Sequence, residues 1–355
     1  MTSAERGPAS YRGAGVDIAA GDRAVELMKA SVKRASRPEM LGGLGGFAGL
    51  FRLDLRRYPE PVLASSTDGV GTKLAIAQAL DRHDTVGIDL VAMVVDDLVV
   101  VGAEPLFLTD YIATGRVVPE KIAAIVSGVA EGCVQAGCAL VGGETAEHPG
   151  VMAPDEYDIS GAAVGVVNAD SVLGPERVCA GDVLVALGSS GLHSNGYSLV
   201  RQVLAGLALD SSPEILDGRT LADELLTPTR IYAQDCLALV AAGGVHAFAH
   251  VTGGGLAGNL ARVLPAGVDA IIERATWSPQ PIFELIARTG RIGRDEMEQA
   301  FNLGVGMVAV VAAEHADAAI GLATSRGVNA WTVGHIQPGT GEVLLVGDYA
   351  GTTFH

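Results

Sequence analysis

Short apolar runs, glycine-containing turns and helical patterns follow one another in that order at several places in the chain. Glycine supplies 47 of the 355 residues, so tight turns and close backbone approaches must be frequent. The clearest cases are 61–66 followed by 68–73, 182–187 followed by 188–195, and 245–251 followed by 252–255. A strand that ends in a glycine turn and leads into a helix is typical of α/β proteins. We therefore expect a mixed α/β fold.

The same pattern divides the chain into an arm and two domains. Residues 1–50 contain one helical stretch, 24–32, and a glycine-rich segment, 42–47, which we expect to be a mobile loop or a backbone surface for a ligand. Turn signals after residue 172 separate a domain over 51–172 from a second over 173–355. Further expected elements are a buried helix over 89–101, a helix over 119–135, and strands over 106–111, 139–141, 157–167, 304–311 and 329–336.

Charge and hydropathy restrict the partners of the chain. The formal net charge of -17 and the pI near 4.8 repel nucleic-acid phosphates and anionic lipids. Residues 1–20 lack the apolar core of a signal peptide, and the apolar stretch 90–108 is interrupted by Asp96, Asp97 and Glu104. We therefore expect a cytoplasmic protein that binds neither nucleic acid nor a membrane. A phosphate ligand would have to be held locally, by backbone N–H groups, a few cations or a divalent metal.

The four cysteines are Cys133, Cys138, Cys179 and Cys236. They form no C-x-x-C pair and match no histidine spacing, so the sequence favours neither a zinc site nor a thioredoxin-like site. We expect small buried side chains in a reducing compartment.

Three common site motifs are absent. Gly69-Val70-Gly71-Thr72-Lys73 is too short for a P-loop and has Thr before Lys. The segment 42–49 follows no convincing strand and opens no regular helix, which excludes a dinucleotide fingerprint. The segment 188–191 misses the nucleophile-elbow spacing of serine hydrolases by one residue.

Carboxylates at turns and on one helix form the first candidate site. On the 89–101 helix, Asp89 and Asp96 point within about 20° of each other and Asp97 about 80° round from Asp89. Asp68 and Glu144 each follow an expected strand and are expected in glycine-containing turns. Together Asp68, Asp97 and Glu144 suggest Mg²⁺ that carries a nucleotide phosphate. Solvated surface carboxylates are the alternative.

Two turns in the C-terminal half form the second candidate site. Each lies where a strand leads into a helix, so backbone N–H groups and the helix dipole would face an anion. Their residues are His193, Ser194, Asn195 and Gly196, and Thr252, Gly253, Gly254 and Gly255. A histidine at a turn is more often a surface residue than a catalyst, but these surroundings make His193 a candidate.

Several segments, in their order and spacing, resemble the aminoimidazole ribonucleotide synthetase family over residues 11–337. They are YRGAGVDIAAG (11–21), RPEMLGGLGGF (37–47), STDGVGTKL (66–74), HDTVGIDLVAMVVDDLVVVGAEP (83–105), LVGGETAEHP (140–149), LGSSGLHSNGYSLV (187–200), LTPTRIY (226–232), HVTGGG (250–255) and FNLGVGM (301–307). Asp96 departs from the family, which more usually has Asn there, and His148 also departs.

The resemblance implies a two-domain ATP-dependent ligase of purine biosynthesis and a homodimer whose N-terminal strands pack across a two-fold axis. Its substrates would be formylglycinamidine ribonucleotide and ATP with Mg²⁺, and K⁺ is an optional further ion. The implied catalytic residues are His193, Lys29 and Asp68, and the metal ligands Asp68, Asp97 and Glu144. The implied ATP contacts are Gly42, Gly43, Gly45, Gly46, Lys73 and Asp89, and the two C-terminal turns would hold the ribonucleotide.

Two alternatives stay open at this point. One is another ATP-dependent enzyme of the superfamily, of the selenophosphate synthetase or thiamine phosphate kinase type. The former should carry a reactive Cys or selenocysteine in its N-terminal glycine-rich segment, but the first cysteine of this chain is Cys133. The other is a nucleotide-binding regulator without catalysis. Against it argue Asp68, Asp97, Glu144, Lys29 and His193.

Overall fold

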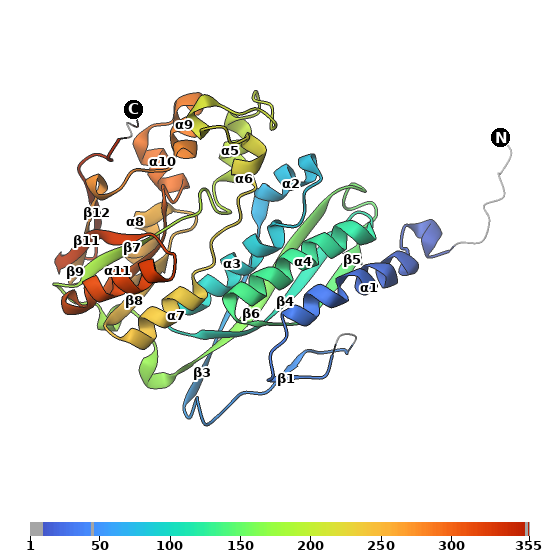
Figure 1. Cartoon of the computed structure of the whole chain (residues 1–355), viewed down its shortest axis with the longest axis horizontal. Helices are drawn as coiled ribbons and strands as arrows, with labels where there is room; N and C mark the ends of the chain where they lie inside the picture. Colours follow the sequence, from blue (N-terminus) through green and yellow to red (C-terminus); the bar gives the residue numbers. More distant parts are fainter. Residues whose placement is uncertain (1–9, 44–45, 352–353, 355) are drawn as a thin grey trace.

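The computed structural model describes residues 10–43, 46–351 and 354, and it contains two large sheets (Figure 1). The first has the strand order β3-β6-β4-β5. Neighbours are antiparallel except β4 and β5, which are parallel. The bounds are β3 Pro61–Gly69, β4 Glu104–Thr114, β5 Ala139–Glu147 and β6 Tyr157–Asn168.

Helices cover one face of this sheet. Helix α3 (Val86–Val99) contacts β3, β6 and β4, and α4 (Pro119–Ala136) packs between α3 and α1 (Ile18–Arg34) (Figure 1). The α3–α4 crossing is very close, because a Cβ on Gly87 would lie 2.1 Å from the Val129 nitrogen. Nearly every side chain of α3 is buried, which explains its almost unbroken apolar sequence.

The opposite face of the four-stranded sheet is open over part of its length, and its end at Leu106 and Val166 is covered by Phe51, Leu53 and Tyr58. Along β6, buried residues alternate with exposed Asp158, Ser160 and Ala162. Tyr111 of β4 is 41% exposed on the same side. An antiparallel sheet with one buried face shows this alternation, so this half of the chain presents a broad strand surface to its surroundings.

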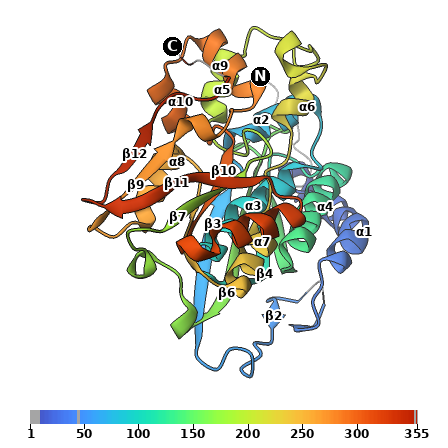
Figure 2. The same ribbon diagram turned by 60° about the vertical axis from the view of Figure 1, so that its left-hand side comes forward.

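The second sheet has the order β12-β9-β11-β7-β10-β8, antiparallel except for the β12/β9 pair (Figure 2). Helices α7 and α11 pack together beside it, and α8 contacts β8 and β12. Bounds of the strands are β7 Val183–Gly188, β8 Val245–His250, β9 Val268–Glu273, β10 Val305–Val311, β11 Ala330–Pro338 and β12 Val343–Val346. The remaining helices and strands are α2 Leu74–Leu80, α5 Tyr197–Val203, α6 Leu221–Leu225, α7 Ala233–Ala242, α8 Gly255–Leu260, α9 Pro281–Gly290, α10 Arg294–Ala300, α11 Ala316–Ser325, β1 Met40–Leu41 and β2 Leu50–Phe51.

The α/β class predicted from the sequence is confirmed. Asp68 and Glu144 differ from the expectation, because both lie inside strands, β3 and β5, rather than in turns. Gly69 is paired with β6 as the last residue of β3, and Gly142 and Gly143 are paired with β4 inside β5, so Asp68 and Glu144 are both strand residues. No helix among the described residues is long and apolar enough to cross a membrane.

Candidate functional site

A cavity of about 760 Å³ lies between α1, the glycine-rich segment and the β4/β5 edge of the first sheet. One face of α1 lines it with small and apolar residues, and β5 adds the stretch from Leu140 to Thr145. Gly43, Gly46 and Phe47 form another wall, and the Phe47 side chain is fully exposed. Gly42 is described but does not line the cavity, and Gly45 lies outside the described residues. The volume suits a nucleotide-sized ligand.

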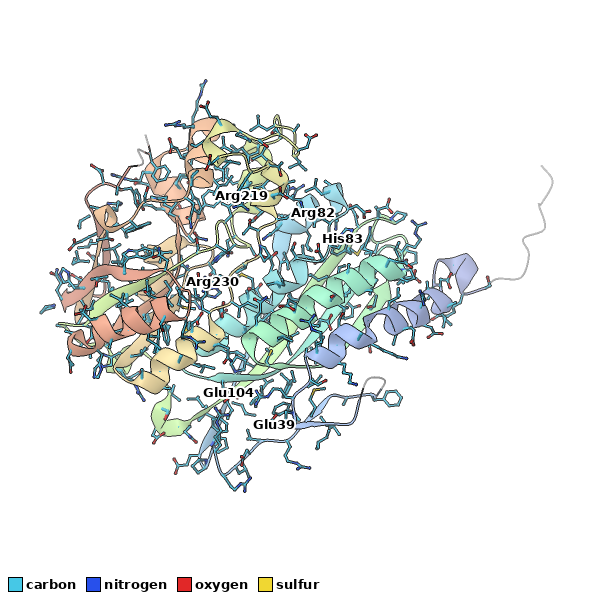
Figure 3. All side chains as sticks on the ribbon, in the orientation of Figure 1. Glu39, Arg82, His83, Glu104, Arg219 and Arg230 are labelled. Atoms are coloured by element: carbon cyan, nitrogen blue, oxygen red, sulfur yellow. The ribbon has the colours of Figure 1, made fainter. Side chains whose placement is uncertain are left out.

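Arg37 anchors the stem of the glycine-rich segment to the sheet. Its guanidinium pairs with Glu39 at 3.2 Å and with Glu104 of β4 at 3.1 Å. It also donates to the carbonyl oxygen of Gly137, at the end of α4. Glu39 and Glu104 lie near each other below the helices in Figure 3. These contacts with β4 and with the end of α4 therefore hold the glycine-rich segment in place beside the cavity.

Asp110 of β4 also lines the cavity, and the sequence analysis did not find it. Burial raises the pKa of its carboxyl group to about 7. The carboxyl lies over Gly143, where a Cβ would be 1.8 Å from Oδ1. The only sequence signal was a lone acid inside an apolar strand.

Lys29 lies outside the cavity, although α1 lines it. Its ammonium group pairs with Glu26 at 2.5 Å, and both side chains are more than half exposed. The residues of α1 that face the cavity include Val25 and Met28. In this structure Lys29 is a solvated helix residue, and its contact with a nucleotide stays a prediction.

An acidic cluster forms where β3 meets α3 and β8. The Asp97 carboxylate is hydrogen-bonded to His250 Nδ1 at 2.9 Å. Burial, with a contribution from nearby Asp97, raises the pKa of Asp68, and the Gly69 N–H and His250 oppose that rise. His250 is buried and its Nε2 has no partner among the described residues. Sequence reasoning brought Asp68 and Asp97 together but missed His250, whose signal was a histidine ending an apolar strand.

Glu144 does not join this cluster within one chain, which corrects the expectation of a three-carboxylate site. Asp68, Gly161, Asp110 and Gly143 are successive partners across the four strands. Three strand spacings separate the two edges by about 14 Å. Asp68 points toward the helices, whereas Glu144, one residue beyond Gly143, points to the open face. One ion cannot be bonded by both carboxylates of a single chain.

Lys73 and Asp89 form a closed ion pair, which does not fit the expected contact with ATP. Both side chains are fully buried, and Lys73 Nζ lies 2.8 Å from Asp89 Oδ1. The ammonium also donates to the carbonyl oxygens of His193 and Thr227 at 3.1 and 2.7 Å. The Thr229 backbone and hydroxyl donate to the same Asp89 oxygen. The pair joins the two halves of the chain, since buried charges need such partners.

The two C-terminal turns lie together, as the sequence suggested. The Gly253 N–H donates to Asn195 Oδ1 at 3.1 Å. Gly254 has a φ of 96° and nothing within 4 Å of the place where a Cβ would stand, so open space adjoins this turn. Gly255 has no such room, because its Cβ would lie 1.7 Å from the Glu298 carbonyl oxygen. Gly196, with a φ of 75°, completes the pair of turns.

His193 is buried beneath these turns and does not project from them. Its φ is 62°, and its Nε2 accepts from the Ser190 N–H at 3.2 Å. Burial, aided by His250 and Lys73, holds the pKa of His193 well below its usual range. The imidazole is therefore neutral and carries its proton on Nδ1, which has no partner among the described residues. Ser194 is also buried and bonds Thr229.

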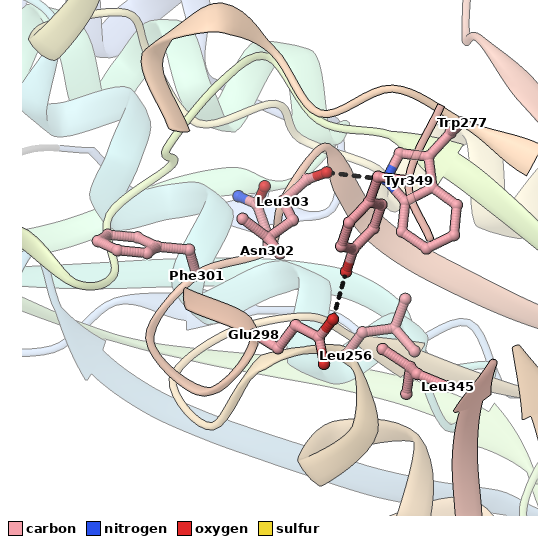
Figure 4. Close-up of a pocket in the computed structure, with 8 residues that line it drawn as sticks. All are labelled: Leu256, Trp277, Glu298, Phe301, Asn302, Leu303, Leu345 and Tyr349. Atoms are coloured by element: carbon pink, nitrogen blue, oxygen red, sulfur yellow. Dashed lines mark hydrogen bonds between the residues drawn. The ribbon is translucent and has the colours of Figure 1, made fainter. Parts of the chain in front are cut away.

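A second concavity, in the C-terminal half, is too small for a substrate. It has a volume of about 10 Å³ and is crossed by hydrogen bonds from Tyr349 to Glu298 and from Trp277 to the Leu303 carbonyl (Figure 4). A space of this size holds about one water molecule. It is a packing feature, and the large cavity and the turn pair are the ligand-facing regions.

Solved structures with the same architecture include a kinase and a hydrogenase maturation protein. Thiamine-monophosphate kinase from Stenotrophomonas maltophilia K279a aligns with a TM-score of 0.66 at 24% identity, covering 92% of this chain and 97% of that one. Hydrogenase maturation protein HypE in complex with ATP aligns with a TM-score of 0.64 at 20% identity, covering 92% and 90%. At these identities the likeness defines the class of fold.

The family follows from closer matches. The model described as "AIR synthase related protein, N-terminal domain" matches residues 48–167, and its C-terminal counterpart matches 180–347. This chain therefore belongs to the AIR synthase related family. Phosphoribosylformylglycinamidine cyclo-ligase from Anaeromyxobacter sp. (strain K) is 57% identical, covering 93% of this chain and 96% of that protein. The enzyme of the same name from Myxococcus xanthus is 53% identical over 96% and 99%.

Proposed function

We propose that this chain is a phosphoribosylformylglycinamidine cyclo-ligase, which closes the imidazole ring of aminoimidazole ribonucleotide with ATP in the cytoplasm. The observation that carries the proposal is identity of more than half over nearly the full length to relatives of that name. Thiamine-monophosphate kinase shares the fold but only 24% of the residues. The described cysteines are all free thiols, which supports a reducing compartment.

The two ligand-facing regions suit the two substrates. The cavity beside β5 would hold ATP, with backbone groups of Gly43, Gly46 and the β5 glycines close to it. The turn pair at Asn195 and Gly253–Gly254 would hold the phosphate of formylglycinamidine ribonucleotide through N–H groups. These assignments include only residues that border open space, and they omit the buried pair Lys73–Asp89.

The reaction needs a leaving group that an amide oxygen does not provide. Transfer of the γ-phosphoryl group of ATP to that oxygen forms an O–P bond and releases ADP. The adjacent nitrogen of the substrate then attacks the carbon that carries the phosphorylated oxygen. The bond between that carbon and the oxygen breaks, which releases phosphate. Such chemistry depends mainly on positioning and on neutralising charge. The chain would contribute N–H donors, a site closed to water, and carboxylates for the metal.

Mg²⁺ fits the acidic cluster. Two carboxylates from separate elements, Asp68 and Asp97, converge there, and hard oxygen donors are what this ion prefers. When bound, Mg²⁺ would supply positive charge beside the phosphates of ATP. His250 would hold the Asp97 carboxylate in place through its Nδ1 contact. K⁺ remains an optional further ion.

A homodimer would bring the separated regions together. In one chain, the acidic cluster adjoins β3 and the ATP cavity adjoins β5, on opposite edges of the sheet. If two open faces pack around a two-fold axis along the strands, β3 of one chain lies over β5 of its partner. Glu144, which points to the open face, would then approach the Asp68–Asp97 cluster of the other chain. Each complete site would use both chains.

The deciding experiment is an assay of the purified chain with formylglycinamidine ribonucleotide and MgATP. We expect stoichiometric aminoimidazole ribonucleotide, ADP and phosphate. Thiamine phosphate serves as the control substrate. ATP consumption with thiamine phosphate alone would overturn the proposal, and ATP binding without turnover of either substrate would indicate a regulator.

A further inference from the structure

Cys179, Asp182 and His246 come together at a corner of the second sheet, at the end of β8 opposite to His250. Cys179 lies in the connector between the sheets, Asp182 directly precedes β7, and His246 belongs to the edge strand β8. One ligand atom from each lies within 4.8 Å of the other two. The sequence spacing resembled no zinc motif because the histidine comes from a strand more than sixty residues away.

The backbone aims these side chains at one point. The pairing of β8 with β10 is interrupted between Ala247 and Val245, which leaves His246 as the extra residue of a β-bulge. Bulges re-aim a side chain relative to the regular pleat. The His246 carbonyl accepts from the Gly174 N–H, so the connector is attached to this edge. The Asp182 carbonyl oxygen accepts a hydrogen bond from the Ile336 N–H, which holds the Asp182 backbone in place.

Asp182 is hydrogen-bonded to both other members of the cluster in this structure. Cys179 Sγ lies 3.4 Å from Asp182 Oδ1, and His246 Nδ1 lies 2.8 Å from Oδ2. A tetrahedral zinc ion with bonds of about 2.0–2.3 Å spaces its ligand atoms about 3.3–3.7 Å apart. Small side-chain rotations would therefore open the cluster to an ion. Asp182 is 3% exposed, whereas Cys179 is exposed, so an ion can enter from solvent.

We propose that Cys179, Asp182 and His246 bind Zn²⁺, with a water molecule in the fourth position. Thiolate, carboxylate and imidazole are the ligands that zinc takes in proteins. Binding releases the thiol proton and leaves His246 neutral with its proton on Nε2. The ion fastens the connector to the start of β8, whose far end carries His250. Its role is structural, because it ties the connector to the start of β7 and to the edge strand β8.

The surroundings of the Cys179 thiol favour its protonated form. Desolvation and the hydrogen bond to Asp182, with a smaller effect of Glu314, raise the pKa of the Cys179 thiol. Both neighbours that act on the thiol carry negative charge, which a divalent cation would balance.

The test uses the full chain, stripped with a chelator and kept in saturating Mg²⁺ so that oxygen-only sites are filled. Co²⁺ replaces Zn²⁺ as a probe, because only a thiolate ligand gives the near-ultraviolet sulfur-to-cobalt band. We expect one Co²⁺ per chain with that band, displaced by Zn²⁺. Cys179→Ser should abolish the band, and His246→Ala should weaken binding at least about tenfold. His335→Ala, an exposed histidine on the neighbouring strand β11, should bind as the wild type does.

Thiol labelling gives a second readout that does not depend on the probe ion. Cys133, Cys138 and Cys236 are buried, so a thiol reagent should modify only Cys179 in the folded chain. Zn²⁺ should slow that modification, and chelator should restore it. Unchanged circular dichroism of Cys179→Ser shows that the variant folds. The proposal is overturned by equal Zn²⁺ binding in wild type and Cys179→Ser, or by labelling that Zn²⁺ leaves unchanged.

Discussion

Lys73 is a charged residue whose side chain is fully buried. Its ammonium group is satisfied by Asp89 and by two backbone carbonyls from the C-terminal half. Removing one partner of such a pair leaves the other charge buried and unpaired, which typically costs about 3–5 kcal/mol. We predict a loss of this size in the free energy of unfolding for Lys73→Met, measured by urea denaturation.

Lys29→Met is the matched control, since it deletes the same charge from an exposed helix position. Its effect on unfolding should stay within about 0.5 kcal/mol. Equal losses in both variants would show that the Lys73 pair does not hold the fold. ATP titration of Lys29→Met also tests the predicted nucleotide contact of that residue.

At the residue scale, the sequence predicted which residues lie close together in a site better than it predicted which side chains are buried. Asp68 and Asp97 were paired correctly as neighbours, because one lies on a helix whose apolar sequence left few alternatives. Lys73 was assigned to ATP only through the family resemblance, since its glycine turn does not match a P-loop. Its actual partners, Thr227 and Asp89, depend on tertiary packing of the two halves, which no local pattern encodes.

The turn between β8 and α8 allows conformational strain to be separated from ligand contact. Gly254 has a positive φ and open space around its missing Cβ, and Gly327 after α11 shares both properties. An L-residue in this conformation costs roughly 1–2 kcal/mol. Both Gly254→Ala and Gly327→Ala should lose that much stability. Only Gly254→Ala should raise the KM for formylglycinamidine ribonucleotide, by about tenfold or more, with ATP binding unchanged.

Calorimetric titration of each ligand into both variants decides this point. Weaker ATP binding with normal ribonucleotide binding in Gly254→Ala would mean that the ligands are assigned to the wrong halves.

Strand β4 carries a carboxyl group that makes stability depend on pH. The pKa of Asp110 is about 7 in the folded chain and near 3.8 when exposed. Between these values the folded chain holds a proton that the unfolded chain has lost, so the free energy of unfolding falls as pH rises. One group gives a slope of at most about 1.4 kcal/mol per pH unit.

Asp110→Asn should remove this contribution, and urea denaturation near pH 5 and near pH 8 measures it. Asp96, whose pKa burial also raises to about 7, remains in the variant and keeps part of the slope. An identical pH dependence in variant and wild type would contradict the prediction.

At the element scale, the sequence showed which segments are strands but not how they are ordered. The buried helix over 89–101 and the strand over 157–167 were recovered nearly to their ends as α3 and β6. β9 and β12 were missed, since β12 is a four-residue edge strand with only partial burial. The order β3-β6-β4-β5 puts Asp68 and Glu144 on opposite edges, and strand order has no local signal.

The whole molecule should be active only as a dimer if its site is shared. Asp97→Asn and Glu144→Gln should each abolish turnover as homodimers. Coexpressed together, they form mixed dimers in which one site has both native carboxylates. About a quarter of the wild-type activity per site should return, because half of the dimers are mixed and one of their two sites is intact.

The control is coexpression of Asp97→Asn with Asp68→Asn, which alter the same side of the site and should not complement each other. No recovery in the Asp97/Glu144 mixture would place a complete site within one chain. Light scattering on the same samples gives the oligomeric state.

The buried Lys73 pair also has a mechanical consequence. A hinge between the halves would have to remove two carbonyl partners from the Lys73 ammonium group, break the Thr72–Ser198 hydroxyl contact of 3.0 Å, and separate Arg82 from Asp223. We therefore expect the halves to move as one body, and any opening of the cavity beside β5 to be a displacement of α1 against β5. A disulfide in Thr72→Cys/Ser198→Cys should leave turnover unchanged when compared with the reduced form of the same variant. Turnover that collapses on oxidation and returns on reduction would reveal a working hinge.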